Sequence, residues 1–192
     1  MTFQPLLPGL LPRPPLCLPP GSHHLWAFPD LSREDRCRHA KALGLAGECL
    51  VDSLLLRYGL SVMRLPEFTA VDRLILHPEQ ILRLQVKTTT ARQNGAWFFN
   101  AHHGYGRSPQ GLRPYEPDAF DLLALVVLPE NAVVFTAERR SRHRVRDAEL
   151  AMIKADPRLS LEAAFWSLGL SVPGPDGPVL GEALEPDAPS IP

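Results

Sequence analysis

The sequence predicts one domain that combines helices and strands. A stretch with apolar residues at helical spacing ends near Tyr58, and two pairs of short apolar runs with the length and composition of strands follow it. The chain has 192 residues, and 45% of them are hydrophobic, which is enough to bury one core. We therefore expect a single domain of the mixed α/β (α+β) class.

A helix is predicted from Ser32 to Tyr58. Ser32 is a residue type that caps helix N-termini, and Asp35, three residues later, completes a weaker form of the capping box. Gly59 follows the last residue of the stretch, at the position where helices commonly end in a glycine.

Two glycines and a glutamate distinguish the middle of this helix. Gly44 and Gly47 interrupt its apolar stripe, which predicts either close packing against a neighbouring element or a break. Glu48 directly follows Gly47. A glutamate beside an apolar stripe is commonly a solvated flank, so this position alone assigns it no function.

A short strand, 60–65, ends at Pro66, and a β-hairpin follows it. The apolar runs 71–76 and 81–88 flank a His-Pro-Glu-Gln turn, which places the proline outside both strands. Side chains two apart in a strand share a face, so Gln85 and Lys87 point the same way and Val86 points to the other face. Asp72 lies near the start of the partner strand, roughly opposite Gln85 and Lys87.

One carboxylate, one amide and one ammonium therefore converge on this hairpin. Metal-assisted phosphodiester cleavage requires such groups, because a hard divalent cation prefers oxygen ligands and keeps waters for the reaction. A neighbouring lysine can orient or deprotonate a water, or neutralise charge on the phosphate. The alternative is an ordinary amphipathic hairpin whose polar side chains are solvated.

The rest of the chain predicts more strands, a loop and two short helices. A strand is expected at 97–100, and a polar loop with adjacent histidines, which we interpret as loop residues and not as a metal pair, at 101–118. The apolar runs 120–128 and 132–136 predict a second hairpin, and 148–154 and 161–168 predict helices. The segment 139–146 is the densest basic patch.

The two ends differ from the domain in composition. Most of the chain's 21 prolines lie near the ends, so residues 1–30 are expected to form a Pro-rich arm and 171–192 a Pro-rich acidic tail around a domain at 31–170. Ten basic against five acidic residues give 83–146 a formal charge of +5, whereas one against six gives 156–192 a charge of −5. The basic half is compatible with phosphate binding.

No apolar run is long enough to cross a bilayer, and prolines interrupt the N-terminus where a signal peptide would need an apolar stretch. The three cysteines are odd in number and lack metal-ligand spacing, which favours reduced thiols. We therefore expect a cytoplasmic protein with no membrane partner.

The sequence resembles the PD-(D/E)xK nuclease superfamily in three stretches and in the order of its elements. The three stretches are Gly44–Glu48, Val71–Ile75 and Leu84–Thr88. The resemblance is to the branch with glutamine in place of the second acid, which includes group I intron homing endonucleases. It covers about 41–136. It implies a restriction-endonuclease-like core, in which helices flank a mixed central β-sheet.

The resemblance also implies a metal site. Asp72 would be the central ligand of Mg²⁺ (or Mn²⁺), with Gln85 bound through its amide oxygen and the main-chain carbonyl of Val86 as a further ligand. Glu48 would be an auxiliary acid, and Lys87 would activate or position a water. Because Gln85 is neutral, Glu48 becomes more important for holding the cation.

The function expected from these features is a divalent-metal-dependent DNA endonuclease with Glu48, Asp72, Gln85 and Lys87 as its catalytic set. Such an enzyme can act as a homodimer, because two strands need two sites. Phosphate contacts are predicted for arginines of the basic half, namely Arg92, Arg107, Arg113, Arg139, Arg140, Arg142 and Arg144.

Two alternatives stay open. The chain could be a catalytically inactive nucleic-acid-binding or adaptor protein on the same fold, with its Pro-rich ends recruiting a protein partner. The arginines of 139–146 could form a solvated turn, paired to Asp147 and Glu149.

Overall fold

A computed structural model describes residues 22–67, 69, 71–104 and 111–173 of the chain. It divides the chain into two compact units, Met1–His39 and Ala40–Pro192. Most of the predicted Pro-rich arm and nearly all of the predicted acidic tail lie outside the described residues, so the expectations about these ends stay predictions. Among the helices within the described ranges, none is long and apolar enough to span a membrane.

The first unit contains a short 3-10 helix, η1 (Ser22–Ala27), and α1 (Arg33–Arg38). The predicted cap is confirmed, because the Ser32 hydroxyl oxygen accepts the Asp35 N–H at 3.0 Å. The prediction of one continuous helix to Tyr58 is wrong, because α1 ends at Arg38 and the backbone of His39 leaves the helical region. α1 buries none of its residues, so it lacks the buried apolar stripe that would have extended the helix.

The second unit begins with α2 (Ala40–Arg57), which buries the predicted stripe residues Leu43, Val51, Leu54 and Leu55. Its end is the one predicted from Gly59. This glycine has φ +77°, and the Leu60 N–H donates to the Leu55 carbonyl at 3.0 Å, which is the Schellman pattern of a helix C-terminus.

The central sheet has five strands in the order β1-β2-β3-β8-β9, and it is mixed. β1 (Ser61–Arg64), β2 (Arg73–Leu76) and β3 (Ile81–Thr89) pair antiparallel in sequence, which confirms the first hairpin. β3 then pairs parallel with β8 (Leu122–Val127), and β8 pairs antiparallel with β9 (Ala132–Thr136), which confirms the second hairpin. All six residues of β8 are buried, as expected of a strand covered on both faces.

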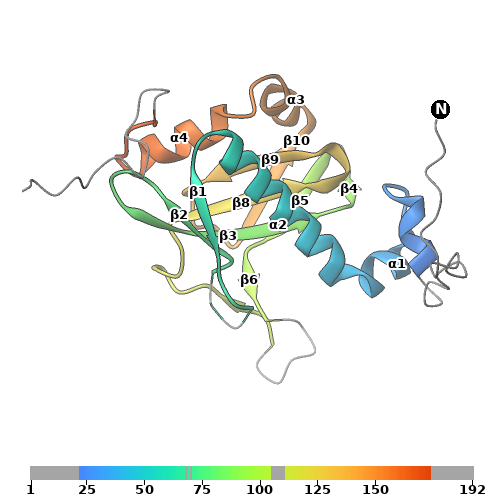
Figure 1. Ribbon diagram of the computed structural model, residues 1–192. Coiled ribbons are helices and arrows are strands. Elements are labelled where there is room, and N and C mark those ends of the chain that lie inside the picture. The colour runs from blue at the N-terminus through green and yellow to red at the C-terminus, as the bar shows by residue number, and fades with distance from the viewer. Residues whose placement is uncertain (1–21, 68, 70, 105–110, 174–192) are drawn as a thin grey trace, which may run out of the picture. The chain divides into compact units, whose positions relative to one another are not determined.

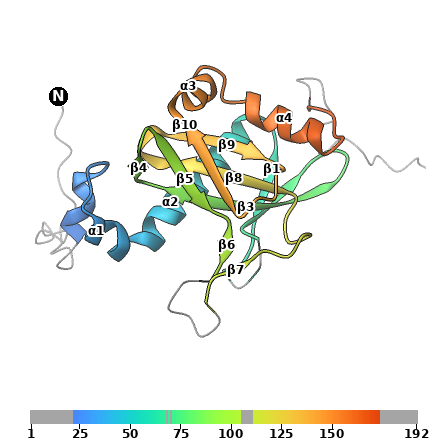
Figure 2. The same cartoon turned by 180° about the vertical axis from the view of Figure 1, so that it is seen from behind.

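Two layers cover this sheet. α2 lies across the face seen in Figure 1 and contacts β3, β1 and β8. A second sheet, in the order β10-β5-β4, lies on the opposite side, as Figure 2 shows. It is formed by β4 (Arg92–Gln93), β5 (Ala96–Asn100) and β10 (Arg142–Arg146), and the helices α3 (Asp147–Ala155) and α4 (Leu159–Ser167) pack on β9. The predicted α+β class, with a mixed central sheet flanked by helices, is confirmed.

The core between the two sheets explains the strand patterns. Trp97 and Phe99 of β5 and Val145 of β10 pack with the buried residues Leu123 and Leu125 of β8. The alternate residues Phe98 and Asn100 of β5 and the three arginines of β10 therefore point outward. The remaining pair, β6 (His102–His103) and β7 (Arg113–Pro114), forms a two-stranded sheet within the region predicted as a loop.

Gly47 marks a close approach of α2 to β3. A Cβ atom at this position would lie 2.1 Å from the Thr88 hydroxyl oxygen and 3.0 Å from its methyl group, so any larger residue would have to displace Thr88. At Gly44 a Cβ atom would meet nothing within 4 Å. The prediction of close packing is therefore confirmed for Gly47, and it brings the next residue, Glu48, toward the first hairpin.

Candidate active site

The first hairpin brings Asp72 and Gln85 into direct contact. The register pairs Arg73 with Leu84, which sets Asp72 beside Gln85 on the neighbouring strand. The Gln85 amide nitrogen donates to Asp72 Oδ2 at 2.6 Å, and the main-chain N–H of Val86 donates to the same oxygen at 2.7 Å. Gln85 is only 6% exposed, so the alternative of a solvated amide on an open strand face does not describe it.

Lys87 lies on the same side of β3 as Gln85. Its ammonium donates to the hydroxyl oxygen of Tyr115 at 2.8 Å and to the main-chain carbonyl of His102 at 3.1 Å. The Tyr115 ring also lies 5.0 Å from the ammonium and packs edge-on against Phe120. Lys87 is thus held in place by a packed aromatic residue and by the backbone of β6.

These side chains line one hollow of about 490 Å³. Its lining includes Asp72, Gln85, Lys87 and Tyr115, together with the acidic residues Glu67 and Glu116. The sequence prediction that carboxylate, amide and ammonium converge agrees with this geometry. The hollow is large enough to admit a phosphate group and several waters.

Burial dominates the electrostatics of the hollow. It raises the pKa of Asp72 above its ordinary value; the Val86 N–H opposes this rise, and the nearby Glu48 carboxylate adds to it. Burial lowers the pKa of Lys87, against the attraction of Asp72. Burial also raises the pKa of Tyr115 to about 12. The carboxylate form of Asp72 is therefore short of compensating positive charge.

Glu48 reaches this region from α2. It lines a second hollow, of about 430 Å³, to which Asp72 and Glu67 also contribute. One of its carboxylate oxygens lies 3.1 Å from the guanidinium of Arg73, whose side chain is only 1% exposed. Glu48 is therefore not the solvated flank that its position on the helix would allow, because it is ion-paired next to Asp72.

The donor set is compatible with a hard divalent cation. Within the described part of the chain, no group of three or more histidine, cysteine, aspartate or glutamate side chains could hold a metal. The set implied by the sequence has only two such residues, Glu48 and Asp72, and its other members are the Gln85 amide and the Val86 carbonyl. All of these can present oxygen, which Mg²⁺ and Mn²⁺ prefer. Gln85 turns its amide nitrogen toward Asp72, so its oxygen would face an ion there only after the amide rotates.

The predicted phosphate-binding arginines lie in different places. Arg92 forms an ion pair with Asp147, and Arg113 is exposed on β7. Arg139 is exposed, Arg140 pairs with Glu138 at 3.1 Å, and Arg107 lies outside the described residues. The alternative of a solvated turn is wrong for 142–146, which form the strand β10, and Asp147 pairs with Arg92 instead of an arginine of that patch.

β10 places its arginines on one outward face. Arg142, Arg144 and Arg146 are exposed, while His143 and Val145 between them are buried. The guanidinium carbons of Arg142 and Arg144 lie 5.0 and 5.7 Å from the ring centre of Phe98 on the neighbouring strand. Cation–π contacts of this kind hold two cations side by side. A groove of about 950 Å³ beside β10 is lined by these arginines and by residues of α3 and α4.

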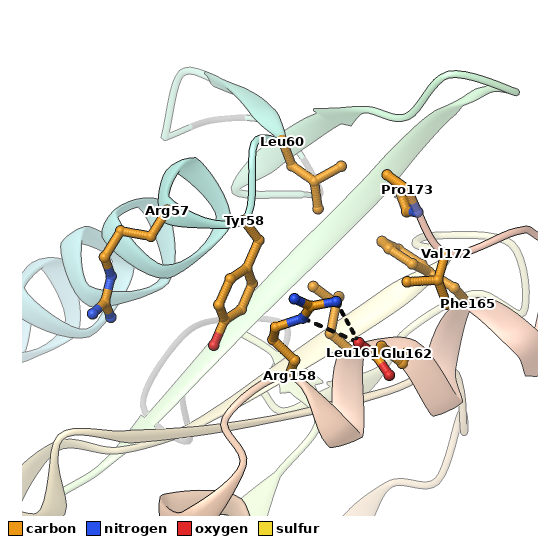
Figure 3. A pocket seen from close by; sticks show the side chains of 9 residues that line it. All are labelled: Arg57, Tyr58, Leu60, Arg158, Leu161, Glu162, Phe165, Val172 and Pro173. Atoms are coloured by element: carbon orange, nitrogen blue, oxygen red, sulfur yellow. Dashed lines mark hydrogen bonds and ion pairs between the residues drawn. The ribbon is translucent and has the colours of Figure 1, made fainter. Parts of the chain in front are cut away.

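A smaller hollow, of about 210 Å³, is built from other elements (Figure 3). Tyr58 at the end of α2 and Phe165 of α4 contribute to it, and Arg158 pairs there with Glu162 at 2.9 Å. Val172 and Pro173 also line this hollow. None of the predicted site residues lies in it.

Sequence reasoning missed four residues around the site: Asp52, Glu67, Arg73 and Tyr115 as a partner of Lys87. Arg73 and Asp52 are far apart in sequence, and only the packing of α2 on the hairpin brings them together. The Arg-Leu-Ile-Leu run offered a signal for Arg73, because a charged residue in an otherwise apolar strand requires a partner.

Comparisons with known proteins concern part of the chain. No protein-family profile matches it, and no curated protein sequence matches it. Among solved structures, a bacterial homing endonuclease is similar over 56% of this chain and 78% of its own, with 16% identity and a TM-score of 0.49. A Holliday junction resolvase from the archaeal hyperthermophile Archaeoglobus fulgidus is similar over 57% of this chain and 88% of its own, with 13% identity and a TM-score of 0.35.

Proposed function

We propose that this chain is a divalent-metal-dependent DNA endonuclease that hydrolyses phosphodiester bonds. One observation supports this function above the others: Asp72, Gln85 and Lys87 line a single hollow in which Gln85 is buried and Lys87 is held by two hydrogen bonds. Burying an amide and an ammonium beside a carboxylate costs free energy, which a hairpin with solvated polar side chains would not incur. Such burial is typical of a site that binds a charged substrate.

Glu48, Asp72, the amide oxygen of Gln85 and the main-chain carbonyl of Val86 would hold Mg²⁺ or Mn²⁺. When bound, such an ion acidifies a water and stabilises negative charge on the phosphate. Asp72 would be the central ligand, because it lines both hollows, one together with Glu48 and the other together with Gln85.

Lys87 acts on the attacking water. Burial lowers its pKa, so more of Lys87 is in the neutral amine form than for an exposed lysine, and only this form can take a proton from the water. Tyr115 and the His102 carbonyl fix the direction of the amine, which keeps it beside Asp72 in the hollow. In its charged form Lys87 instead neutralises charge that develops on the phosphate.

The outward face of β10 and β5 binds DNA phosphates. Arg142 and Arg144 are held by Phe98, so binding fixes fewer free rotamers than it would for unsupported arginines. The face adjoins the hollow through the backbone: the Ala101 N–H donates to the Ser141 carbonyl at 2.9 Å, and the next carbonyl, of His102, contacts Lys87. Action as a homodimer belongs to the same proposal, because cutting both strands of a duplex needs two such sites. Location in the cytoplasm is also part of the proposal.

The test is plasmid cleavage by the full chain. Supercoiled plasmid and a four-way junction are incubated with the protein in Mg²⁺, in Mn²⁺ and in EDTA. We expect metal-dependent cutting that Lys87→Ala abolishes while DNA binding persists. Lys154→Ala is the matched control, because Lys154 lies on the exposed side of α3 and pairs with Glu130. Cutting by Lys87→Ala at the normal rate would remove the assignment.

A non-cutting nucleic-acid-binding or adaptor protein is a second candidate, and one observation favours it. Glu48 already has a cationic partner in Arg73, and Asp72 already accepts two hydrogen bonds. The site is therefore partly satisfied without a metal. This candidate predicts salt-sensitive DNA binding that neither Mg²⁺ nor Asp72→Asn changes, with no cutting in the plasmid assay.

A further inference from the structure

Arg73 is the most buried charged side chain among the described residues, and it touches both sides of the candidate site. Its Nε and one terminal nitrogen donate to the two oxygens of Asp52, at 2.6 and 2.9 Å. Its other terminal nitrogen lies 3.1 Å from Glu48 and donates to the main-chain carbonyl of Asp72 at 2.8 Å. One guanidinium thus joins the helix α2 to the strand that carries the central carboxylate.

The contacts of Arg73 are unequal. Asp52 binds it through two parallel hydrogen bonds, the strongest geometry available to a guanidinium and a carboxylate. Glu48 contacts it through a single oxygen, and 25% of the Glu48 side chain is exposed. Asp52 is therefore the firm anchor, and Glu48 is the partner that can leave at lower cost.

The charge of this cluster matches a divalent cation. Two carboxylates, Glu48 and Asp52, contact the guanidinium, and together with the nearby Asp72 carboxylate they leave a formal charge of −2 before Lys87 is considered. Arg73 carries the one positive charge of the cluster. It forms an ion pair with Glu48, which is one of the two carboxylates that would hold the ion. The guanidinium and an ion at Asp72 would therefore compete for Glu48.

We propose that Arg73 is a built-in counter-ion of Glu48 that a divalent cation displaces, while Asp52 keeps the guanidinium in place. Without an ion, Arg73 holds Glu48 against the hairpin and satisfies its charge. When an ion binds at Asp72, Glu48 changes partners, and Arg73 stays on Asp52. Arg73 and Asp52 are positioning residues that set the metal affinity without touching the ion. This inference rests on the proposed metal site.

The test measures Mn²⁺ affinity of the full chain by calorimetric titration, without DNA. Asp52→Asn leaves Glu48 as the main anionic partner of Arg73, so we expect Mn²⁺ affinity to fall by about threefold or more. Loss of one negative charge would by itself weaken a cation site. Glu67→Gln controls for this loss of charge. Glu67 shares the hollow with Asp72, so the substitution removes one negative charge near the site without removing a contact of Arg73. We expect it to change the affinity less than Asp52→Asn does.

The decisive variant combines Asp52→Asn with Arg73→Met, which removes one charge of each sign. Competition predicts that this double variant binds Mn²⁺ about threefold or more tightly than the native chain, because Glu48 has lost its competing partner. Affinity equal to or weaker than native would overturn the proposal. Thermal unfolding without metal follows the stability of each variant separately.

Two further outcomes are informative. If the double variant does not fold, the single variants decide. Competition between Arg73 and the ion for Glu48 is overturned if Asp52→Asn binds Mn²⁺ with the same affinity as Glu67→Gln or as the native chain. If the native chain itself binds no Mn²⁺, both this proposal and the proposed nuclease site fail. Native binding with no effect of Asp52 or Arg73 refutes the competition alone.

Discussion

The packing of α2 on the sheet predicts opposite effects for the same substitution at two glycines of one helix. At Gly47 an added Cβ would lie 2.1 Å from Thr88 Oγ1, and rotation of the threonine about χ1 would not fully relieve this contact, because its Cβ would still lie at 3.1 Å. Overpacking of this kind costs about 1–3 kcal/mol. Replacing a helical glycine by alanine stabilises a helix by about 1 kcal/mol. We therefore expect Gly47→Ala to destabilise the fold by up to about 2 kcal/mol.

Gly44→Ala is the matched control. It lies three residues earlier in α2, and an added Cβ there meets nothing within 4 Å, so only the gain in helix propensity remains. The two variants should differ in free energy of unfolding by about 1–3 kcal/mol, measured by urea denaturation followed by far-UV circular dichroism. Equal stabilisation by both alanines would refute the close approach of α2 to β3.

Two further predictions concern charge. The folded-state pKa of Asp72 lies above the ordinary 3.8, so the stability that this group contributes is present at low pH and is lost as the pH rises through the raised pKa. Asp72→Asn lacks this loss, so its stability relative to the native chain, measured by metal-free thermal unfolding, should increase as the pH rises through the raised pKa. A stability difference that does not depend on pH would contradict the buried carboxylate. Arg142→Gln combined with Arg144→Gln should reduce the salt dependence of DNA binding, measured by fluorescence anisotropy, by about two phosphate contacts, whereas an unchanged slope would exclude the face of β10.

Local patterns predicted the elements on which the site is built. The Ser32 cap, the glycine after Tyr58 and both hairpins are encoded by short-range signals, and the structure confirms them. Alternation in β3 correctly placed Gln85 and Lys87 on one side. These features were accessible because caps, turns and strand faces depend on neighbours a few residues away.

Features that depend on long-range packing were missed. The ion pair of Arg73 with Asp52 joins residues 21 positions apart, and neither residue has a local pattern that names its partner. The strand β10 was missed for a different reason. Its exposed arginines give 142–146 the composition of a charge run, and only His143 and Val145 show the alternation of a strand. A period of two should therefore be sought within charge runs as well as within apolar ones.

In the proposed function, Asp72 organises a divalent-cation site at the end of the first hairpin. The most direct measurement is titration of the full chain with Mn²⁺, with the fraction of unbound ion followed by electron paramagnetic resonance, for the native chain and Asp72→Asn. We predict saturable binding by the native chain and its loss in the variant, with the fold of both preserved. Equal binding by the two proteins would place the ion elsewhere and contradict the site.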